Sequence, residues 1–141
     1  MTLAVRFHPP GVPAEHLPIY RLEAELRKLP PVDCPVEEEF CDGLYARTMH
    51  IPAGTVATGA VHSKECFLVV RSGEVLLTTD DGAQHLKAGD MVKSRAGCKR
   101  AAAALTDCAV TTFHGNPTNE RDEKRLWEIF TVPAPAMALE C

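Results

Sequence analysis

The sequence lacks long apolar runs, clusters of basic residues and paired cysteine motifs, and each absence excludes a class of protein. Crossing a bilayer takes about 20 consecutive apolar residues, and no segment comes near that length. The N-terminus has no basic run followed by an unbroken apolar stretch, which is the pattern of a secretion signal. We therefore expect a soluble protein without a membrane partner, located in the cytoplasm.

The charge balance and the cysteine spacing exclude two further classes of protein. The chain carries 15 Lys and Arg against 19 Asp and Glu, and its basic residues are dispersed. A surface that binds nucleic acid normally shows as a basic patch or stripe, so we expect no nucleic-acid partner. The six cysteines include no C-x-x-C pair, and without a secretion signal we expect free thiols and no four-cysteine zinc site.

Short strands at regular spacing dominate the middle of the chain. Apolar, β-branched and aromatic runs bounded by turn signals predict strands at residues 44–51, 65–71, 74–79, 83–86, 91–95, 99–105 and 108–114. Residues 35–40 are expected to form a loop or a short edge strand. Because no helix fits between these strands, the pattern indicates an antiparallel sandwich or barrel, and 141 residues suffice for one such domain.

The two ends of the chain are predicted to differ from this centre. Four prolines in residues 1–18 predict an extended arm, and residues 132–141 a loose tail, so that the single domain covers residues 19–131. Helical spacing predicts one helix at 19–29, which either binds another chain or lies on its own barrel. A second helix is expected at about 120–130, with Thr118 or Asn119 as its cap. Exposed sheet edges favour a homo-oligomer, most simply a dimer.

Two consecutive motifs carry a resemblance to a known family. The run PAG…H…E…G at residues 52–73, followed by AGD at 88–90 and a glycine-centred turn, resembles the paired motifs of the cupin superfamily, over about residues 43–115. The resemblance implies an all-β antiparallel jelly-roll barrel, with the predicted helices flanking it. Many cupins hold one divalent metal, such as Zn, Fe, Mn or Ni, so it implies either that cofactor or none.

The family's metal ligands are only partly present. Matching the first motif places Ala60 and His62 at its two histidine positions and Cys66 at its glutamate position. The second motif places Arg100 at the third histidine. Only His62 is unchanged, so the resemblance implies a degraded metal site.

A narrower resemblance concerns short strings. The runs DGLYAR, IPAGT and TTFH are similar to small cupin-like proteins encoded by tailed phages. This implies a phage or prophage origin, and either a virion component or an accessory factor in the host cytoplasm, with other phage structural proteins as partners.

One candidate site would hold a metal. His62, Cys66 and His114 could converge at one end of the barrel as imidazole and thiolate ligands, with Glu65 as an alternate carboxylate. Alternatively, Cys66 is a small buried apolar side chain and the two histidines form hydrogen bonds in the barrel mouth. A Cys66 nucleophile with a histidine base would lack an orienting third group, so we assign no catalytic residue.

A second candidate site would bind an anion. Arg100 brings a fixed positive charge to a ligand position and could bind a carboxylate or phosphate bidentately, with Lys99 and Arg47 in support. Alternatively, Arg100 pairs with Glu65 or with one of the carboxylates at 37–39.

These features leave three functions of different classes. The first is a structural or accessory protein that acts through protein contacts and self-association. The second is a metal-dependent cupin enzyme, an oxygenase or isomerase acting on a small molecule. The third is a small-anion binding module that uses Arg100.

Overall fold

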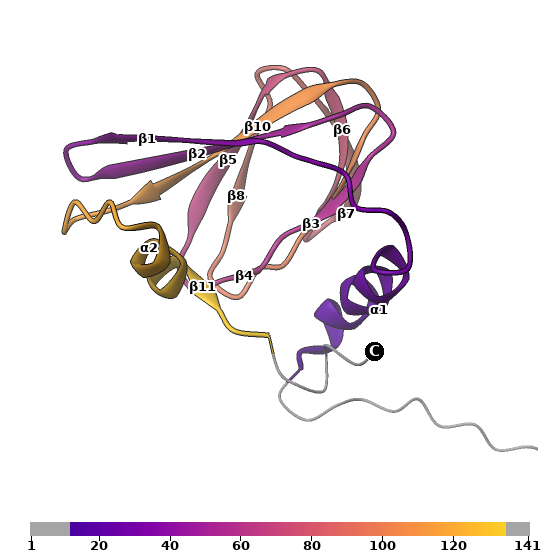
Figure 1. Ribbon diagram of the computed structural model, residues 1–141, viewed down its shortest axis with the longest axis horizontal. Helices are drawn as coiled ribbons and strands as arrows, with labels where there is room; N and C mark the ends of the chain where they lie inside the picture. The colour runs from indigo at the N-terminus through magenta and orange to yellow at the C-terminus, as the bar shows by residue number, and fades with distance from the viewer. Residues whose placement is uncertain (1–11, 135–141) are drawn as a thin grey trace, which may run out of the picture.

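Two antiparallel sheets form the barrel in the computed structural model, which describes residues 12–134 (Figure 1). The larger sheet has the order β1 (Val36–Cys41), β2 (Leu44–Ile51), β10 (Cys108–Gly115), β5 (Cys66–Ser72) and β8 (Met91–Ser94). The smaller sheet has the order β3 (Val56–Thr58), β9 (Ala101–Ala104), β6 (Glu74–Thr79) and β7 (Gly82–Lys87). A two-stranded ribbon joins β4 (Val61–His62) to β11 (Thr131–Val132). The predicted all-β antiparallel jelly-roll is confirmed.

The core lies between the two sheets and settles which strand faces point inward. Its buried residues come from alternate positions of the facing strands: Ile51, Leu68, Val70, Val75, Leu77, Leu86, Ala104, Cys108 and Val110. Met49 packs against this cluster. Because side chains alternate along a strand, Tyr45 and Arg47 lie on the same inward face of β2 as Met49 and Ile51.

A glycine fixes the tight connection between β5 and β6. Gly73 has φ +75°, and a Cβ on it would collide with the backbone of Asp107 and Cys108. Only glycine fits a position that combines this left-handed conformation with so close a backbone approach.

The N-terminal helix begins earlier than predicted. A 3-10 turn η1 (Ala14–His16) leads into α1 (Leu17–Leu26), so residues 14–18 are helical where an extended arm was expected. Pro18 fits there because the first turn of a helix needs no N–H from it. Val12 is also buried, at 2% exposed, and residues 1–11 of the predicted arm lie outside the described residues. The buried Leu17, Ile19 and Tyr20 show that α1 lies on its own barrel, which was one of the two predicted alternatives.

The second helix, α2 (Glu123–Phe130), starts later than predicted. Asn119 has φ 53° and closes a turn through the hydrogen bond from its N–H to the Asn116 carbonyl, 3.0 Å. This turn keeps the chain non-helical until Asp122, whose side chain caps the helix by accepting from the Arg125 N–H at 3.0 Å. The predicted caps at Thr118 or Asn119 are therefore wrong.

Both helices lie on one side of the barrel (Figure 1). After α2 the chain enters β11, so Val132 is paired with Val61 rather than being part of a loose tail. Residues 135–141 of that predicted tail lie outside the described residues. In the part of the chain that the structure describes, no helix combines the length and apolar character needed to span a membrane.

Candidate functional site

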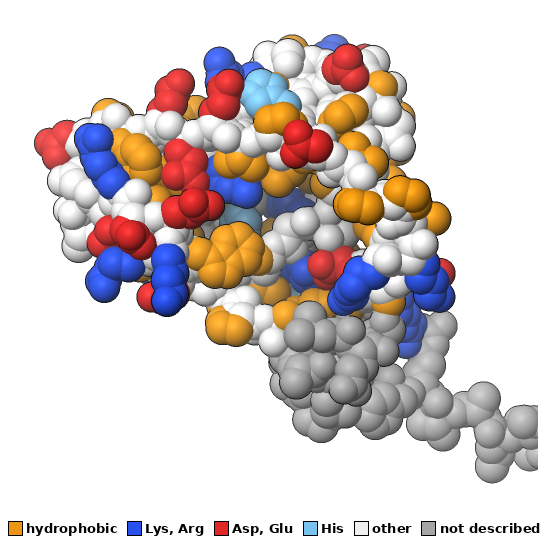
Figure 2. Space-filling model, viewed as in Figure 1, with side chains coloured by type: hydrophobic (Ala, Val, Ile, Leu, Met, Phe, Trp, Pro, Cys, Tyr) orange, Lys and Arg blue, Asp and Glu red, His pale blue; other side chains and the backbone are white. Residues whose placement is uncertain are grey.

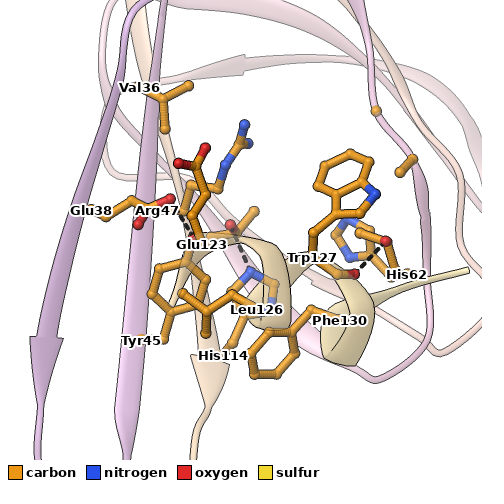
Figure 3. A pocket seen from close by; sticks show the side chains of 14 residues that line it. Val36, Glu38, Tyr45, Arg47, His62, His114, Glu123, Leu126, Trp127 and Phe130 are labelled. Atoms are coloured by element: carbon orange, nitrogen blue, oxygen red, sulfur yellow. Dashed lines mark hydrogen bonds between the residues drawn. The ribbon is translucent and has the colours of Figure 1, made fainter. Parts of the chain in front are cut away.

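A cavity of about 240 Å³ opens between the larger sheet and α2 (Figure 3). The sheet contributes Tyr45 and Arg47 from β2, and Thr112 and His114 from β10. The helix forms the opposite wall with Leu126, Trp127 and Phe130, and His62 on β4 completes the lining. Figure 2 shows this face of the molecule hollowed near its centre, with basic and histidine side chains inside the hollow.

A smaller cavity of about 110 Å³ continues from this mouth into the barrel. The two cavities share Arg47, Gly59, Ala60, His62 and Thr112 in their linings. The inner walls are otherwise mostly apolar and include Met49, Ile51, Leu68, Leu77 and Val110. The site is therefore a polar junction with an apolar chamber behind it.

His62 and Cys66 are in direct contact at this junction. The His62 Nδ1 lies 3.2 Å from the Cys66 Sγ. Burial lowers the pKa of His62, and the charges of Arg100 and Arg47 lower it further. Burial also raises the pKa of the Cys66 thiol to about 11. At neutral pH the pair is an uncharged imidazole and an uncharged thiol, so Cys66 is not an activated nucleophile.

His114 is held within an aromatic stack. Its ring centroid lies 5.4 Å from that of Tyr45 and 4.9 Å from that of Phe130, and its Nε2 is hydrogen-bonded to the Thr112 hydroxyl at 2.9 Å. Burial lowers the pKa of His114 to about 4, with smaller contributions from His62 and Arg47. Its Nδ1 is buried with no hydrogen-bond partner among the described residues.

The predicted metal ligands converge only in part. The rings of His62 and His114 lie 6.0 Å apart, so the expected meeting of these histidines with Cys66 is found. Glu65 instead lies outside the cavity, where its carboxylate forms an exposed ion pair with Lys93 at 3.2 Å.

These donors do not fit a metal site as they stand. Within residues 12–134, no three His, Cys, Asp or Glu side chains are grouped so that they could hold an ion. The cations Arg47 and Arg100, close enough to lower the pKa of His62, would also repel a metal ion.

Lys99 is engaged by the protein rather than free for a ligand. Its ammonium lies 2.7 Å from the Glu23 carboxylate, donates to the Gly59 carbonyl at 2.8 Å, and sits 4.6 Å from the centre of the Tyr20 ring. The side chain is only 4% exposed. Lys99 thus fastens α1 to the barrel.

Arg100 is also engaged, and in neither of the two ways predicted. Its guanidinium donates to the Ser94 hydroxyl at 3.0 Å, the Thr78 carbonyl at 2.5 Å and the Lys93 carbonyl at 3.2 Å. These bonds tie the residue just before β9 to β6 and β8. Arg100 therefore links the two sheets.

Arg47 differs from Lys99 and Arg100 in the contacts of its side chain. It lines the two cavities and is half-buried, and it faces Glu38 across the β1–β2 register. The Glu38 carboxylate accepts from the Tyr45 hydroxyl at 3.1 Å. Among the described residues no hydrogen bond or ion pair holds the Arg47 guanidinium.

The sequence did not reveal the wall formed by α2. The sequence predicted only a helix at about 120–130, whereas in the structure Leu126 and Phe130 line the cavity and are 3% and 6% exposed. Trp127 was not singled out, although it is 59% exposed beside the cavity. A large apolar residue on the polar side of an amphipathic helix is the one signal that could have marked it.

Comparisons with solved structures bear on the fold. No protein-family model and no curated protein matches this chain. Among solved structures, it is similar to the Cupin_2 domain of an XRE family transcriptional regulator from Enterobacter cloacae, with a TM-score of 0.50, 15% identity, and coverage of 57% of this chain and 93% of that one. It is also similar to KdgF from a Halomonas species, with a TM-score of 0.53, 16% identity, and coverage of 66% and 91%.

A third structure is a salicylate 1,2-dioxygenase from Pseudaminobacter salicylatoxidans, with a TM-score of 0.56 and 14% identity. The match covers 82% of this chain but only 35% of the dioxygenase. The chain therefore has the fold of the cupin superfamily. These likenesses show the fold alone, and none of the three structures is described as a phage protein, so the phage origin stays a prediction from the sequence.

Proposed function

We propose that this cupin domain binds a small organic carboxylate in the barrel mouth, with Arg47 as the residue that pairs with the anionic group. The proposal keeps the anion-binding function expected from the sequence and moves it from Arg100 to Arg47. The observation that carries it is the guanidinium of Arg47, which is half-buried at the junction of two cavities and is held by no side chain or carbonyl of the described residues. A partly buried arginine of this kind is well suited to bidentate pairing with a carboxylate.

The rest of the lining supports one charged group joined to an apolar body. The inner chamber of about 110 Å³ offers Leu68, Leu77 and Val110 to a small hydrocarbon group. His62 and His114 have lowered pKa values and are neutral at pH 7, so they can accept or donate hydrogen bonds without adding charge.

The outer cavity disfavours more highly charged anions. Glu38 and Glu123 both line it and both are exposed. Their negative charges oppose a dianion such as phosphate more strongly than a monocarboxylate. The preferred ligand therefore carries a single negative charge.

The test is a ligand series measured by thermal unfolding and titration calorimetry. Straight-chain carboxylates from propanoate to octanoate are compared with their primary amides and with inorganic phosphate. At a hundredfold excess over Kd, a bound ligand stabilises the fold by about 2.7 kcal/mol, which raises Tm by roughly 8 °C for a chain of this size. We expect a carboxylate of suitable length to raise Tm, and the amides and phosphate to do so much less.

The matched variants are Arg47→Met and Arg21→Met, the latter at an exposed position on α1. Loss of a charged hydrogen-bond donor should weaken carboxylate binding about ten- to hundredfold in Arg47→Met, while Arg21→Met binds as the wild type does. Equal binding by the wild type and Arg47→Met would overturn the proposal. So would amides that bind as well as the acids.

A further inference from the structure

The outward face of the larger sheet carries large apolar side chains. Phe67 on β5 is 45% exposed, Phe113 on β10 is 41% exposed and Met91 on β8 is 61% exposed. Phe67 and Phe113 are direct partners in the register of the two strands, so both side chains lie on the same outward face. α2 packs on the opposite, inward side, against Tyr45 and His114. Within residues 12–134, no segment of the chain covers these two phenylalanines.

One row of residues crosses this face from edge to edge. The strand register aligns Glu39, Ala46, Phe113, Phe67 and Lys93, one residue from each strand in spatial order. Directly paired residues of antiparallel strands lie on the same face, so the row is acidic at one edge, apolar in the middle and basic at the other. We call this row the outer row.

The outer row is complementary to a second copy of itself. A two-fold axis that runs parallel to β10, midway between two facing sheets, reverses the order of the strands and keeps the position along them. Glu39 of one copy then faces Lys93 of the other, and the large Phe67 faces the small Ala46, with Phe113 on the axis. An axis perpendicular to the strands would instead set Glu39 against Glu39, which is unfavourable.

We propose that two copies of this chain associate through the outward faces of their larger sheets, with the outer row at the centre and the two-fold axis along β10. Aligned packing of two sheets is an ordinary geometry for such faces, and it buries the exposed phenylalanines. Lys93 is also paired with Glu65, but both side chains are more than three-fifths exposed, and a pair of that kind contributes little. Lys93 can therefore turn to Glu39 of the second copy at small cost. This proposal is independent of the ligand proposed above.

The test is a charge-reversal series measured by sedimentation equilibrium. Glu39→Lys and Lys93→Glu each place like charges opposite one another at two symmetric positions, so each should weaken dimerisation about tenfold or more. The double variant Glu39→Lys/Lys93→Glu restores opposite charges and should regain wild-type dimerisation. An equimolar mixture of the two single variants should form heterodimers, because every charged contact in them is again complementary.

Further variants control for the fold and for other partners. Glu128→Lys, at an exposed position on α2, should dimerise as the wild type does. Phe113→Ser should weaken dimerisation while its circular dichroism spectrum stays unchanged. A wild type that is strictly monomeric at about 100 µM, where even a weak dimer of micromolar Kd would be populated, overturns the proposal. A dimer that both single variants leave intact overturns it as well. So does a double variant that fails to regain wild-type dimerisation.

Discussion

The stability of this fold should fall steeply between pH 7 and pH 4 because of one buried histidine. His114 is 6% exposed, and its pKa in the folded protein is about 4, against 6.5 when unfolded. A histidine with a lowered pKa binds more protons in the unfolded state, so its neutral form stabilises the fold above pH 6.5, and that stabilisation is lost as the pH falls toward 4. The free energy of unfolding should therefore rise with pH across this window.

The magnitude follows from the two pKa values. Going from pH 7.5 to pH 5, His114 alone should lower the free energy of unfolding by about 2 kcal/mol, and below pH 4 by about 3 kcal/mol. His62 acts in the same direction because its pKa is also lowered, so removing His114 should leave part of the pH dependence in place.

Urea unfolding at pH 7.5 and pH 5 measures this directly. The comparison variant is His114→Phe, which retains an aromatic ring between Tyr45 and Phe130, and the control is His85→Phe at an exposed position on β7. The loss of stability between the two pH values should be smaller in His114→Phe by about 2 kcal/mol, and unchanged in His85→Phe. If His114→Phe loses as much stability as the wild type, then His114 is already charged in the fold or is solvated, and the description of the cavity wall is wrong.

Three other changes probe the remaining contacts. Lys99→Met leaves the Glu23 carboxylate without its buried partner, so it should destabilise the protein by about 3 kcal/mol in urea unfolding and make α1 more sensitive to protease. The double variant Lys99→Met/Glu23→Gln should recover part of the lost stability. Gly73→Ala should fail to fold or lose more than about 3 kcal/mol, whereas Gly82→Ala, which has a positive φ but open space around it, should lose only about 1 kcal/mol. Because its pKa is raised to about 11, the Cys66 thiol should react with iodoacetamide at pH 7.5 at least tenfold more slowly than the exposed thiol of Cys41. Equal rates would contradict the burial of Cys66.

Much of the barrel could be predicted because the bounds of its strands depend on residues close together in the sequence. The predicted strands at 44–51 and 74–79 have the same bounds as β2 and β6, since β-branched runs end there at turn residues. The first residues of the two helices were harder to predict. The start of α2 depends on one capping hydrogen bond to Asp122, and the start of α1 depends on how Pro18 is accommodated. The proline-rich stretch was read as extended, although proline is also compatible with the first turn of a helix.

The site was predicted less completely, because its geometry depends on contacts between distant segments. That His62, Cys66 and His114 could converge at one end of the barrel was predicted, with two alternatives for what they do there. Nothing local to Lys99 shows that Glu23, far away in the chain, will neutralise it. Arg47 was predicted only as a support for Arg100, because both faces of its strand mix polar and apolar residues and gave no inward direction.

The prediction that this chain has lost the metal ligands of the cupin motif can be tested by restoring them. Ala60, His62 and Arg100 all line the inner cavity, and Cys66 contacts His62, so the four positions that the sequence resemblance matches to the cupin ligand motif lie around one cavity. The variant Ala60→His/Arg100→His replaces a small side chain and a repelling cation by two imidazoles. With His62 and Cys66, it presents three nitrogen donors and one sulfur donor, a set that suits Zn²⁺.

We expect this double variant to bind close to one equivalent of zinc in elemental analysis and to gain thermal stability when zinc is added, since metal binding is coupled to folding. The wild type should retain less than about a tenth of an equivalent at ordinary site affinities. Arg100→Met serves as the control for the lost bonds to Ser94 and to the Thr78 carbonyl, and it should be destabilised without gaining zinc. A double variant that folds by circular dichroism but binds no zinc would show that Ala60 and Arg100 do not occupy ligand positions. Weak zinc binding would then depend on the shape of the barrel mouth rather than on these two side chains.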